Sequence, residues 1–407
     1  MIELFGLATV AGYAPFMHTL YTWPRMFVLG IGAFTFSQRA KCGPVGFIGF
    51  GFLVLAFICS MVGADFVVST FGMYGTANNG IVTICGMWAL YAGLSNTAEN
   101  RDRFARGLEL GLMLSAAWCL RQILITGLEV RAFGFIGSPV YLGAVLVVVL
   151  PILLAGRRWV GVVCTAFMLW ACGTRSAYIG AAVGLAWYAV SLGGRRLKII
   201  AGAIILFSAF SVFAVSLKKA NSDRGRILVY EATWKGIKER PLFGWGPEGS
   251  YFIYQKYKDQ EWSRVYRGTT QDHAHNSVLD AVATIGIFGG FLFVAVWLAA
   301  LYGVKQSPSA VAAFLGLAAF SMFNPVGLAA KTLIVSVAAI WDESPRKINV
   351  SIVASSLAFI CLAASFRTVL HERLAGIQSN YLGIMRVRAG ENMRVIFPVF
   401  VGGLDNK

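Results

Sequence analysis

The chain has 407 residues, of which 57% are hydrophobic and only 13% are charged. A soluble domain carries about twice that charged fraction, so the composition excludes an ordinary soluble protein and indicates a polytopic membrane protein. The net charge of +16 does not indicate nucleic-acid binding, because most Lys and Arg stand in the gaps between apolar runs rather than on one basic surface.

Apolar runs separated by polar, glycine or proline breaks predict an all-α fold, in which residues 1–407 form a single integral-membrane domain with about twelve transmembrane helices. Thirteen candidate spans would leave the basic C-terminal tail, residues 367–407, outside the cell. We therefore expect that one segment within 308–341 is re-entrant, or that two early spans are short. The candidate spans lie near residues 4–20, 24–38, 45–63, 79–95, 104–126, 138–155, 158–173, 175–193, 197–216, 277–302, 308–322, 326–341 and 349–366.

The distribution of basic residues predicts the orientation of these helices. One set of alternate loops is rich in Lys and Arg, whereas the opposite set offers only Arg25, Arg131, Arg175 and Lys331. By the positive-inside rule the basic set is cytoplasmic, so the N-terminus lies inside. The long polar segment, residues 217–274, then faces outside, which is the periplasm in a cell with two membranes.

This outer segment has predicted structure of its own. Ile227, Tyr230, Trp234 and Ile237 recur at helical spacing, which predicts a short amphipathic helix lying on the membrane. Pro241 ends this helix, and GWGPEG follows as a tight glycine-rich turn. Several tyrosines and a tryptophan come next, which is typical of a membrane–water boundary. The segment is therefore predicted to be a folded periplasmic loop rather than a disordered spacer.

The stretch TTQDHAHNSVLDAVATIGIFGG holds two of the four histidines of the chain, at the point where a long apolar run begins. Asp272 or Asn276 can cap the helix that starts here. Asn276, Asp280 and Thr284 then follow at i, i+4 and i+8 and form a polar stripe on one helix face, which capping and helix packing would also explain. Neither of these roles accounts for His275.

An imidazole takes up a proton near neutral pH, so His275 is a candidate general base, and His273 is an equal candidate because spacing does not choose between them. By the predicted topology Arg175 and Arg226 lie on the same outer side, and Arg224 stands beside Arg226 at the start of the amphipathic helix. Each arginine alone is also explained as a helix-end or lipid-headgroup contact. Their convergence with a histidine is what favours a functional site.

Missing motifs narrow the chemistry. The chain has no Walker A loop, no G-x-S-x-G, no H-E-x-x-H and no DxD pair, and its seven cysteines lack CxxC spacing. Nucleotide-driven transport, serine hydrolysis and zinc proteolysis are therefore unsupported, and we expect neither a metal nor a cofactor. Arginines that bind phosphate bidentately, together with an imidazole base, suit the displacement of a phosphorylated lipid leaving group by a hydroxyl.

Four stretches, in this order, resemble the O-antigen ligases and the related O-antigen polymerases of bacterial envelopes. RAFGFIGSPVYLGAVLVVVLP is similar to a family segment that enters a membrane helix, and CGTRSAYIG to the family's Thr/Ser-Arg-Ser/Gly segment. GRILVYEATWKGIKERPLFGWGPEGSY resembles its Gly-Arg-…-Pro-Leu-Phe-Gly-x-Gly element, and HAHNSVLDAVATIGIFGG resembles its His-Asn-x-x-Leu-…-Gly-x-x-Gly element. Together they cover residues 131–290. Trp245 and Glu248 depart from the pattern, since smaller residues are common there.

The resemblance implies a metal-independent glycosyltransferase of the bacterial inner membrane. In that family a glycan on undecaprenyl diphosphate is transferred to a hydroxyl on the periplasmic face. The acceptor of the ligases is the lipid A–core oligosaccharide, and the acceptor of the polymerases is another lipid-linked repeat unit. The implied partners are thus a lipid-linked glycan donor, a glycan or lipid A–core acceptor and membrane lipids, without nucleic acid.

Carried over by position, the family motifs imply roles for single residues. Arg175 and Arg226 would hold the diphosphate, His275 would activate or orient the acceptor, and Asn276 would cap the helix and position His275. The same motifs make Arg224 the alternative to Arg226. Asp280 and His273 would support the site, with the base assignment between the two histidines left open.

A lipid-linked sugar transporter is the main alternative of a different class. It predicts paired inverted repeats and charged or broken helices near the middle of the membrane. The chain shows no convincing repeat, and its polar residues gather at the predicted outer interface instead.

Overall fold

A computed structural model describes residues 1–12, 22–72, 80–95, 100–127, 130–194, 220–266, 271–343 and 347–365. The predicted span 197–216 and the predicted tail 367–407 lie outside these described residues. Within them the fold is helical, apart from one antiparallel pair of two-residue strands. The elements are α1 (Ile2–Ala11), α2 (Thr22–Ser37), β1 (Lys41–Cys42), α3 (Pro44–Val62), α4 (Phe66–Phe71), α5 (Ile81–Leu94), α6 (Arg101–Thr126), η2 (Gly134–Ile136), α7 (Pro139–Ala155), α8 (Trp159–Cys172), α9 (Arg175–Ser191), α11 (Ala220–Glu239), α12 (Ser250–Tyr257), α13 (Gln260–Tyr266), α14 (Ser277–Gly303), α15 (Pro308–Ser321), α16 (Leu328–Ile340), β2 (Ile348–Asn349) and a last helix, Ser351–Ser365.

The all-α prediction is confirmed, since each predicted span inside the described residues coincides with a helix over most or part of its length. Three of the described helices, α3, α6 and α14, are long and apolar enough to cross a membrane, and shorter apolar helices accompany them. Helix α15 has 14 residues, which at about 1.5 Å per residue is shorter than a bilayer core of about 30 Å. The number of about twelve spans stays a prediction.

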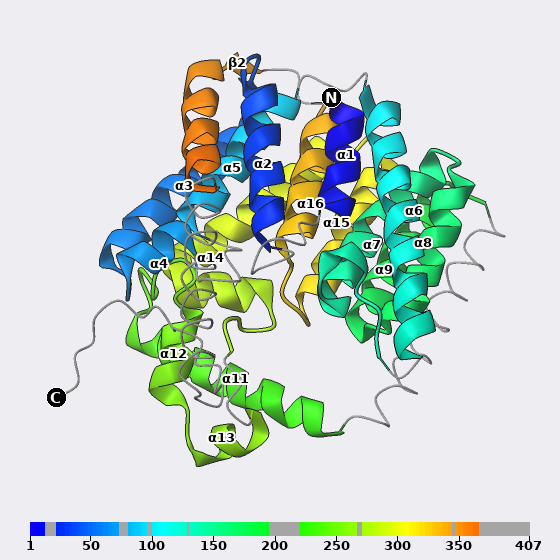
Figure 1. The fold of residues 1–407 in the computed structure, drawn as a ribbon. Helices are drawn as coiled ribbons and strands as arrows, with labels where there is room; N and C mark the ends of the chain where they lie inside the picture. Colours follow the sequence, from blue (N-terminus) through cyan, green and yellow to red (C-terminus); the bar gives the residue numbers. More distant parts are fainter. Residues whose placement is uncertain are drawn as a thin grey trace, which may run out of the picture.

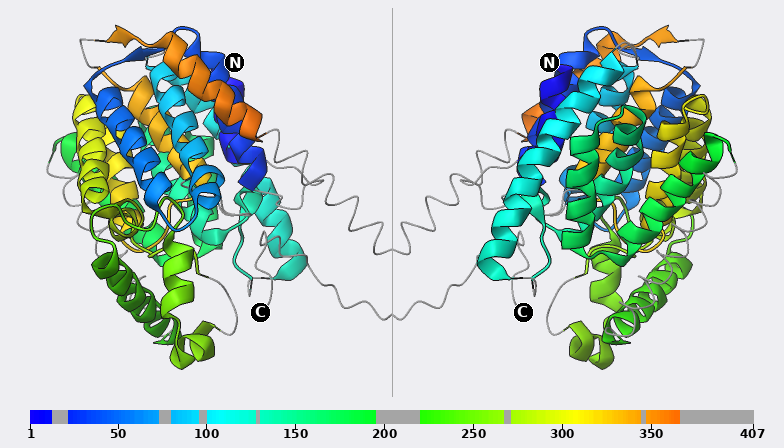
Figure 2. Two further views of the ribbon diagram at one scale, coloured as in Figure 1. Left: turned by 90° about the vertical axis from the view of Figure 1, so that its left-hand side faces the viewer. Right: turned by 90° about the vertical axis from the view of Figure 1, so that its right-hand side faces the viewer.

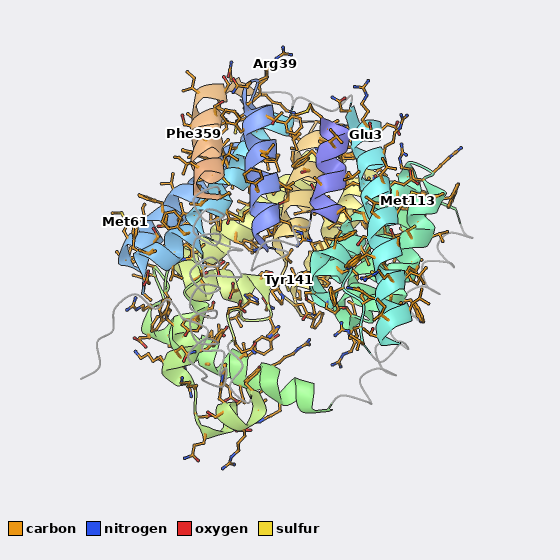
Figure 3. All side chains as sticks on the ribbon, in the orientation of Figure 1. Glu3, Arg39, Met61, Met113, Tyr141 and Phe359 are labelled. Carbon is orange, nitrogen blue, oxygen red and sulfur yellow. The ribbon has the colours of Figure 1, made fainter. Side chains whose placement is uncertain are left out.

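The apolar helices pack side by side in a bundle, and α11, α12 and α13 lie together beyond one end of it (Figures 1 and 2). Large apolar side chains such as Met61, Met113 and Phe359 are exposed on the outside of the bundle (Figure 3). Lipid tails would cover such a surface, whereas water would not. These features and the apolar helices support a membrane protein.

Glycines bring the helix that carries Arg175 against α15. A Cβ atom on Gly180 of α9 would stand 2.6 Å from the carbonyl oxygen of Gly316 on α15, and a Cβ on Gly316 would stand 2.8 Å from that of Gly180. Such close backbone approach is typical of helix pairs in membranes, where van der Waals packing replaces the hydrophobic effect. The start of α9 is thereby fixed beside the turn that joins α15 to α16.

Helix α14 is broken at Gly286, where φ is 76° and ψ is −179°. The peptide groups freed by the break pair with the turn after α11: Trp245 N–H donates to the Ala283 carbonyl at 3.0 Å and Gly246 N–H to the Thr284 carbonyl at 2.8 Å. In return Ile287 N–H donates to the Pro241 carbonyl at 2.9 Å. A broken helix is tolerated in a membrane only when other groups satisfy its backbone in this way. The glycine-rich turn after α11 and the break in α14 are therefore joined by these three hydrogen bonds, an arrangement that we call the interlock. A side chain at Gly286 would collide there with the Leu242 carbonyl.

Helix α11 lies in the segment where the sequence predicts an amphipathic helix. Its Leu228, Val229 and Ala232 side chains are buried against α12 and α13. Of the residues on the predicted apolar face, Ile237 is buried in the same cluster, whereas Ile227 and Trp234 are 45% and 55% exposed. Contact of the exposed side chains with lipid stays a prediction.

Candidate active site

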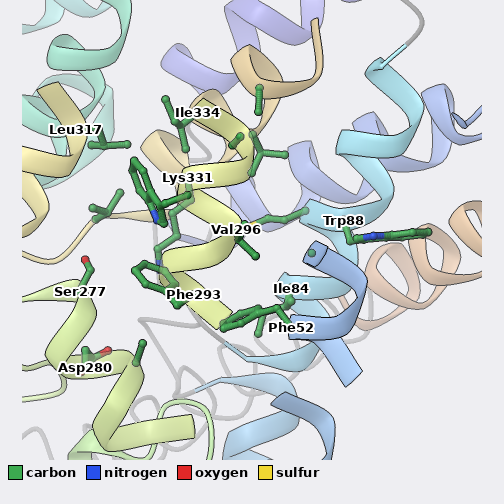
Figure 4. A pocket seen from close by; sticks show the side chains of 18 of the residues that line it. Phe52, Ile84, Trp88, Ser277, Asp280, Phe293, Val296, Leu317, Lys331 and Ile334 are labelled. Carbon is green, nitrogen blue, oxygen red and sulfur yellow. The ribbon is translucent and has the colours of Figure 1, made fainter. Parts of the chain in front are cut away.

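A cavity of about 260 Å³ lies between α3, α5, α14, α15 and α16 (Figure 4). Its polar end is formed by the start of α14 and the first turn of α16. The rest of the wall is apolar and follows both helices toward their C-terminal ends, where Tyr91 of α5 is reached. The polar lining residues are His273, His275, Asn276, Ser277, Asp280, Thr284 and Lys331.

His275 has a left-handed backbone conformation, with φ at 54°. A residue other than glycine in this region is strained by roughly 1–3 kcal/mol, and such strain clusters at functional sites. Its Nδ1 atom is buried and has no hydrogen-bond partner among the described residues. Burial, followed by the positive charges of His273 and Arg226, lowers the pKa of His275 to about 4. The imidazole is therefore neutral at neutral pH and able to accept a proton.

Two side chains hold His275 in this strained conformation. Asn276 caps α14, its Oδ1 accepting from the amides of Val278 and Leu279 at 3.0 Å each, while its Nδ2 donates to the Met322 carbonyl at 3.3 Å. This cap decides between the two predicted cap residues in favour of Asn276. On the other side Asp280 Oδ1 accepts from Ala274 N–H at 3.1 Å. The backbone of His275 is thus anchored on both sides.

Asp280 also connects the histidine segment to the glycine-rich turn. The same Oδ1 atom accepts from the hydroxyl of Ser250 at 2.7 Å. Ser250 follows the turn whose backbone is interlocked with the break in α14, so one carboxylate joins three parts of the site. Asn276 and Asp280 of the polar stripe on α14 therefore make structural contacts that hold the segment around His275.

His273 differs from His275 in its electrostatic environment. Its Nε2 lies 2.8 Å from Asp272 Oδ1 and 3.4 Å from the hydroxyl of Tyr141 on α7. Burial lowers the pKa of His273, but Asp272, Asp280 and Glu248 outweigh burial, so that the pKa is raised above its usual value. One histidine is consequently driven toward the charged form and the other toward the neutral form. This contrast, which spacing could not supply, favours His275 as the base.

Arg175 is the first residue of α9, and its surroundings are organised by Arg131. The Arg131 guanidinium donates to the Cys172 carbonyl at 2.7 Å and to the Thr174 hydroxyl at 2.6 Å. Burial lowers the pKa of Arg131, and the nearby positive charge of Arg175 acts in the same direction. Arg131 therefore holds the loop that precedes Arg175, although this brings the positive charges of Arg131 and Arg175 close together.

The turn between α15 and α16 connects the start of α9 with the start of α14. Asn324 in this turn donates to the hydroxyl of Ser176 at 2.5 Å, next to Arg175. The Met322 carbonyl, two residues earlier, accepts from the cap residue Asn276, next to His275. Arg175 and His275, a hundred residues apart in sequence, are thus held by the same short turn.

The two arginines at the start of α11 are placed differently. The positive charge of Arg226 acts on His275. Arg224 forms a bidentate ion pair with Glu261 of α13, at 2.6 and 2.8 Å, and both side chains are nearly half exposed. Arg224 thus holds α13 against α11, and Arg226 is the arginine that shares an electrostatic environment with the histidines.

Lys331 at the polar end and Glu248, whose charge acts on Lys331 and His273, were not among the predicted site residues. Glu248 is 3% exposed and has a φ of 60°, and Lys331 lines the cavity from the first turn of α16. The isolated lysine in the apolar run LAAKTLIVSVAAI was a signal for Lys331, because a charge inside a membrane helix is a functional candidate by default. For Glu248 the sequence showed only a departure from the family pattern.

Residues 160–294 match the family model of the O-antigen ligase. This segment is similar to the O-antigen ligase family. It contains Arg175, Arg226, His275 and the interlocked glycines, and it covers about a third of the chain, so the resemblance inferred from the sequence is confirmed there. No curated protein matches the chain. The match of residues 160–294 indicates a ligase-like glycosyltransferase activity on a lipid-linked glycan and an acceptor in a membrane.

Metal independence is a separate prediction. In the part of the chain that the structure describes, no three His, Cys, Asp or Glu side chains come together as a metal site would require. The polar end instead combines Asp280 with Lys331 and the two histidines. Metal independence itself stays a prediction.

Proposed function

We propose that this protein transfers a glycan from undecaprenyl diphosphate to a hydroxyl acceptor on the periplasmic face of the inner membrane, as in the ligation of O-antigen to lipid A–core. The observation that carries the proposal is His275: a neutral, strained imidazole with a buried Nδ1 that lacks a partner among the described residues, at the polar end of an apolar cavity. A buried nitrogen of this kind is unfavourable by about 1–3 kcal/mol until a substrate group bonds to it.

The cavity supports a donor that joins a charged head to a long apolar chain. Its apolar wall, formed by side chains such as Phe293, Val296 and Trp297, suits polyprenyl units. Arg226, whose charge acts on His275, and Arg175 at the start of α9 would supply guanidinium groups that bind phosphate oxygens bidentately. The distribution of polarity along the cavity therefore matches the distribution of polarity in a polyprenyl diphosphate.

The proposed reaction is one displacement. The acceptor hydroxyl donates a hydrogen bond to His275 and attacks the anomeric carbon, while the bond from that carbon to the diphosphate oxygen breaks. The diphosphate leaves with the bonding electrons, its charge balanced by Arg175 and Arg226, and His275 takes the proton of the acceptor hydroxyl.

Donor binding would also make His275 a stronger base. The pKa of about 4 reflects burial and two positive neighbours, one of which is Arg226. A diphosphate bound to Arg226 offsets that positive charge and adds negative charge near the ring, and both effects favour the protonated imidazole. Proton acceptance is thereby coupled to the presence of the donor.

A His275→Ala variant tests the proposal in a strain that lacks the chromosomal copy. We expect transfer to fall by at least about a hundredfold, because general-base catalysis contributes roughly 10²–10⁴-fold, while the protein still inserts and the lipid-linked donor accumulates. Full activity of this variant would remove His275 from the mechanism. The outward exposed Lys235→Ala variant is the control for expression and insertion.

A polymerase with the same donor is the second candidate, and the glycan profile of the deletion strain separates the two. Loss of all long glycan from lipid A, with polymer still built on the lipid carrier, indicates a ligase. A single repeat unit on lipid A indicates a polymerase. Accumulation of donor on the cytoplasmic face would instead support the less favoured transporter.

A further inference from the structure

The charged groups at the polar end of the cavity include a lysine that the proposed reaction has not used. Lys331 stands in the first turn of α16 and lines the cavity. The negative charges of Glu248 and Asp280 both act on it. Glu248 acts on His273 as well, so these groups form one electrostatic cluster beneath the histidine segment.

Lys331 marks the level at which the cavity changes from polar to apolar. On α16 the next lining residues are Ile334, Val335 and Ala338, at i+3, i+4 and i+7, so they continue the same helix face without a charge. Figure 4 shows Lys331 between the apolar side chains around Ile334 and the polar side chains of Ser277 and Asp280. A ligand with a charged head and an apolar chain would place their junction beside Lys331.

The backbone and burial of Glu248 favour a role for its carboxylate, whose negative charge acts on Lys331. Glu248 has a φ of 60° in a turn that already contains Gly244, Gly246 and Gly249. Glycine would adopt this conformation without strain, whereas another residue is disfavoured there by roughly 1–2 kcal/mol. A glutamate that is only 3% exposed is also unfavourable unless it is partnered. The backbone strain and the burial of the charge are both offset if the carboxylate holds a cation in a buried site.

We propose that Lys331 binds the phosphate adjoining the polyprenyl chain of the donor, with Glu248 as the positioning residue that holds its ammonium group at the polar–apolar boundary. The inference rests on the proposed function, because it assigns one further contact to the same donor. Arg175 and Arg226 then face the phosphate that carries the glycan, and Lys331 recognises the lipid-proximal phosphate.

Binding of undecaprenyl diphosphate to the full chain in nanodiscs tests the inference. K331M should raise the Kd about tenfold, equal to about 1.4 kcal/mol, and K331R should stay within about threefold because it keeps the charge. K305M is the matched control, since Lys305 lies at the opposite end of α14 over the ring of Tyr302 and should leave the Kd unchanged. Wild-type affinity in K331M would overturn the inference.

A double-mutant cycle separates ligand contact from a purely structural ion pair. E248Q alone should weaken binding about threefold, and K331M/E248Q should bind like K331M alone, because Glu248 acts through Lys331. Thermal unfolding of each variant shows that it is folded. Recovery of wild-type affinity in the double variant would show that the pair only balances itself, which contradicts the inference.

The same experiment distinguishes this inference from the proposed function. If wild-type protein and K331M bind undecaprenyl diphosphate equally, the contact to Lys331 is wrong while the donor class stands. If the wild-type protein binds undecaprenyl monophosphate and not the diphosphate, the donor class itself is wrong, and the inference is overturned with it.

Discussion

The cavity has charged groups at both ends, and the two ends satisfy them differently. At the far end the Tyr91 hydroxyl donates to Asp342 at 2.9 Å, and Lys347 lies 3.5 Å from the same carboxylate, which is 1% exposed. At the polar end His275 has a left-handed backbone and a buried nitrogen without a partner among the described residues. The charged groups at the far end thus satisfy one another, whereas His275 at the polar end retains a nitrogen that a ligand could bond.

The backbone makes the same distinction. Apart from glycines, three described residues have positive φ: Arg157, Glu248 and His275. Arg157 is exposed in the turn after α7, where a left-handed residue commonly follows a helix. His275 lines the polar end of the cavity, where contacts of Asn276 and Asp280 hold its backbone, and the charge of Glu248 acts on His273 and Lys331 at the same end. Strain combined with burial therefore separates the site from an ordinary helix end.

Loosening the interlock at the break in α14 should have the largest effect. G286A adds a Cβ that collides with the Leu242 carbonyl at a φ of 76°, so we expect a loss of about 3–5 kcal/mol of unfolding free energy. G127A is the matched control, because Gly127 has a φ of 72° with nothing within 4 Å, and it should cost only about 1 kcal/mol. Thermal unfolding in detergent measures both. Equal losses of unfolding free energy in G286A and G127A would show that the interlock does not support the polar end of the cavity.

Removing one carboxylate from each end should then separate stability from activity. D342A leaves Tyr91 and Lys347 without their buried partner and should lower the unfolding free energy by about 3 kcal/mol, with the transfer rate per folded molecule nearly unchanged. D280A should cost about 1–2 kcal/mol of stability but reduce the transfer rate at least tenfold, because the segment before Asn276 loses its anchor. Equal losses of rate in the two variants would remove the functional difference between the ends.

The smallest expected effect concerns pH. The positive charge of His273 helps to lower the pKa of His275, so H273N should raise that pKa. A raised pKa leaves less neutral imidazole in acid, and the acidic limb of kcat/KM should move to higher pH, with a severalfold loss on the limb and an unchanged plateau. Y141F is the control, because it removes a neighbour of His273 without changing charge. An unmoved limb in H273N would show that the two histidines are not coupled.

Much of the fold followed from the sequence because membrane helices are local features. The lengths of the apolar runs and the breaks between them predicted where the helices lie. The order of four motifs indicated the O-antigen ligase family, whose model matches residues 160–294. Asn276 as a helix cap was among the predicted options and is confirmed. The packing of Leu228, Val229 and Ala232 of α11 against α12 and α13 was not predicted, since it depends on helices that follow α11 in the sequence.

The sequence by itself determined that this is an apolar helical chain with a histidine pair and arginines on one predicted side of the membrane, because hydropathy and charge order depend on neighbouring residues only. The tertiary structure alone decided that burial lowers the pKa of His275 while carboxylates raise that of His273, that the charge of Arg226 acts on His275, and that Lys331 lines the same cavity. These properties arise from burial, backbone strain and charges contributed by helices far apart in sequence. Residue spacing in the sequence cannot predict these properties, since they depend on which helix ends meet at the cavity.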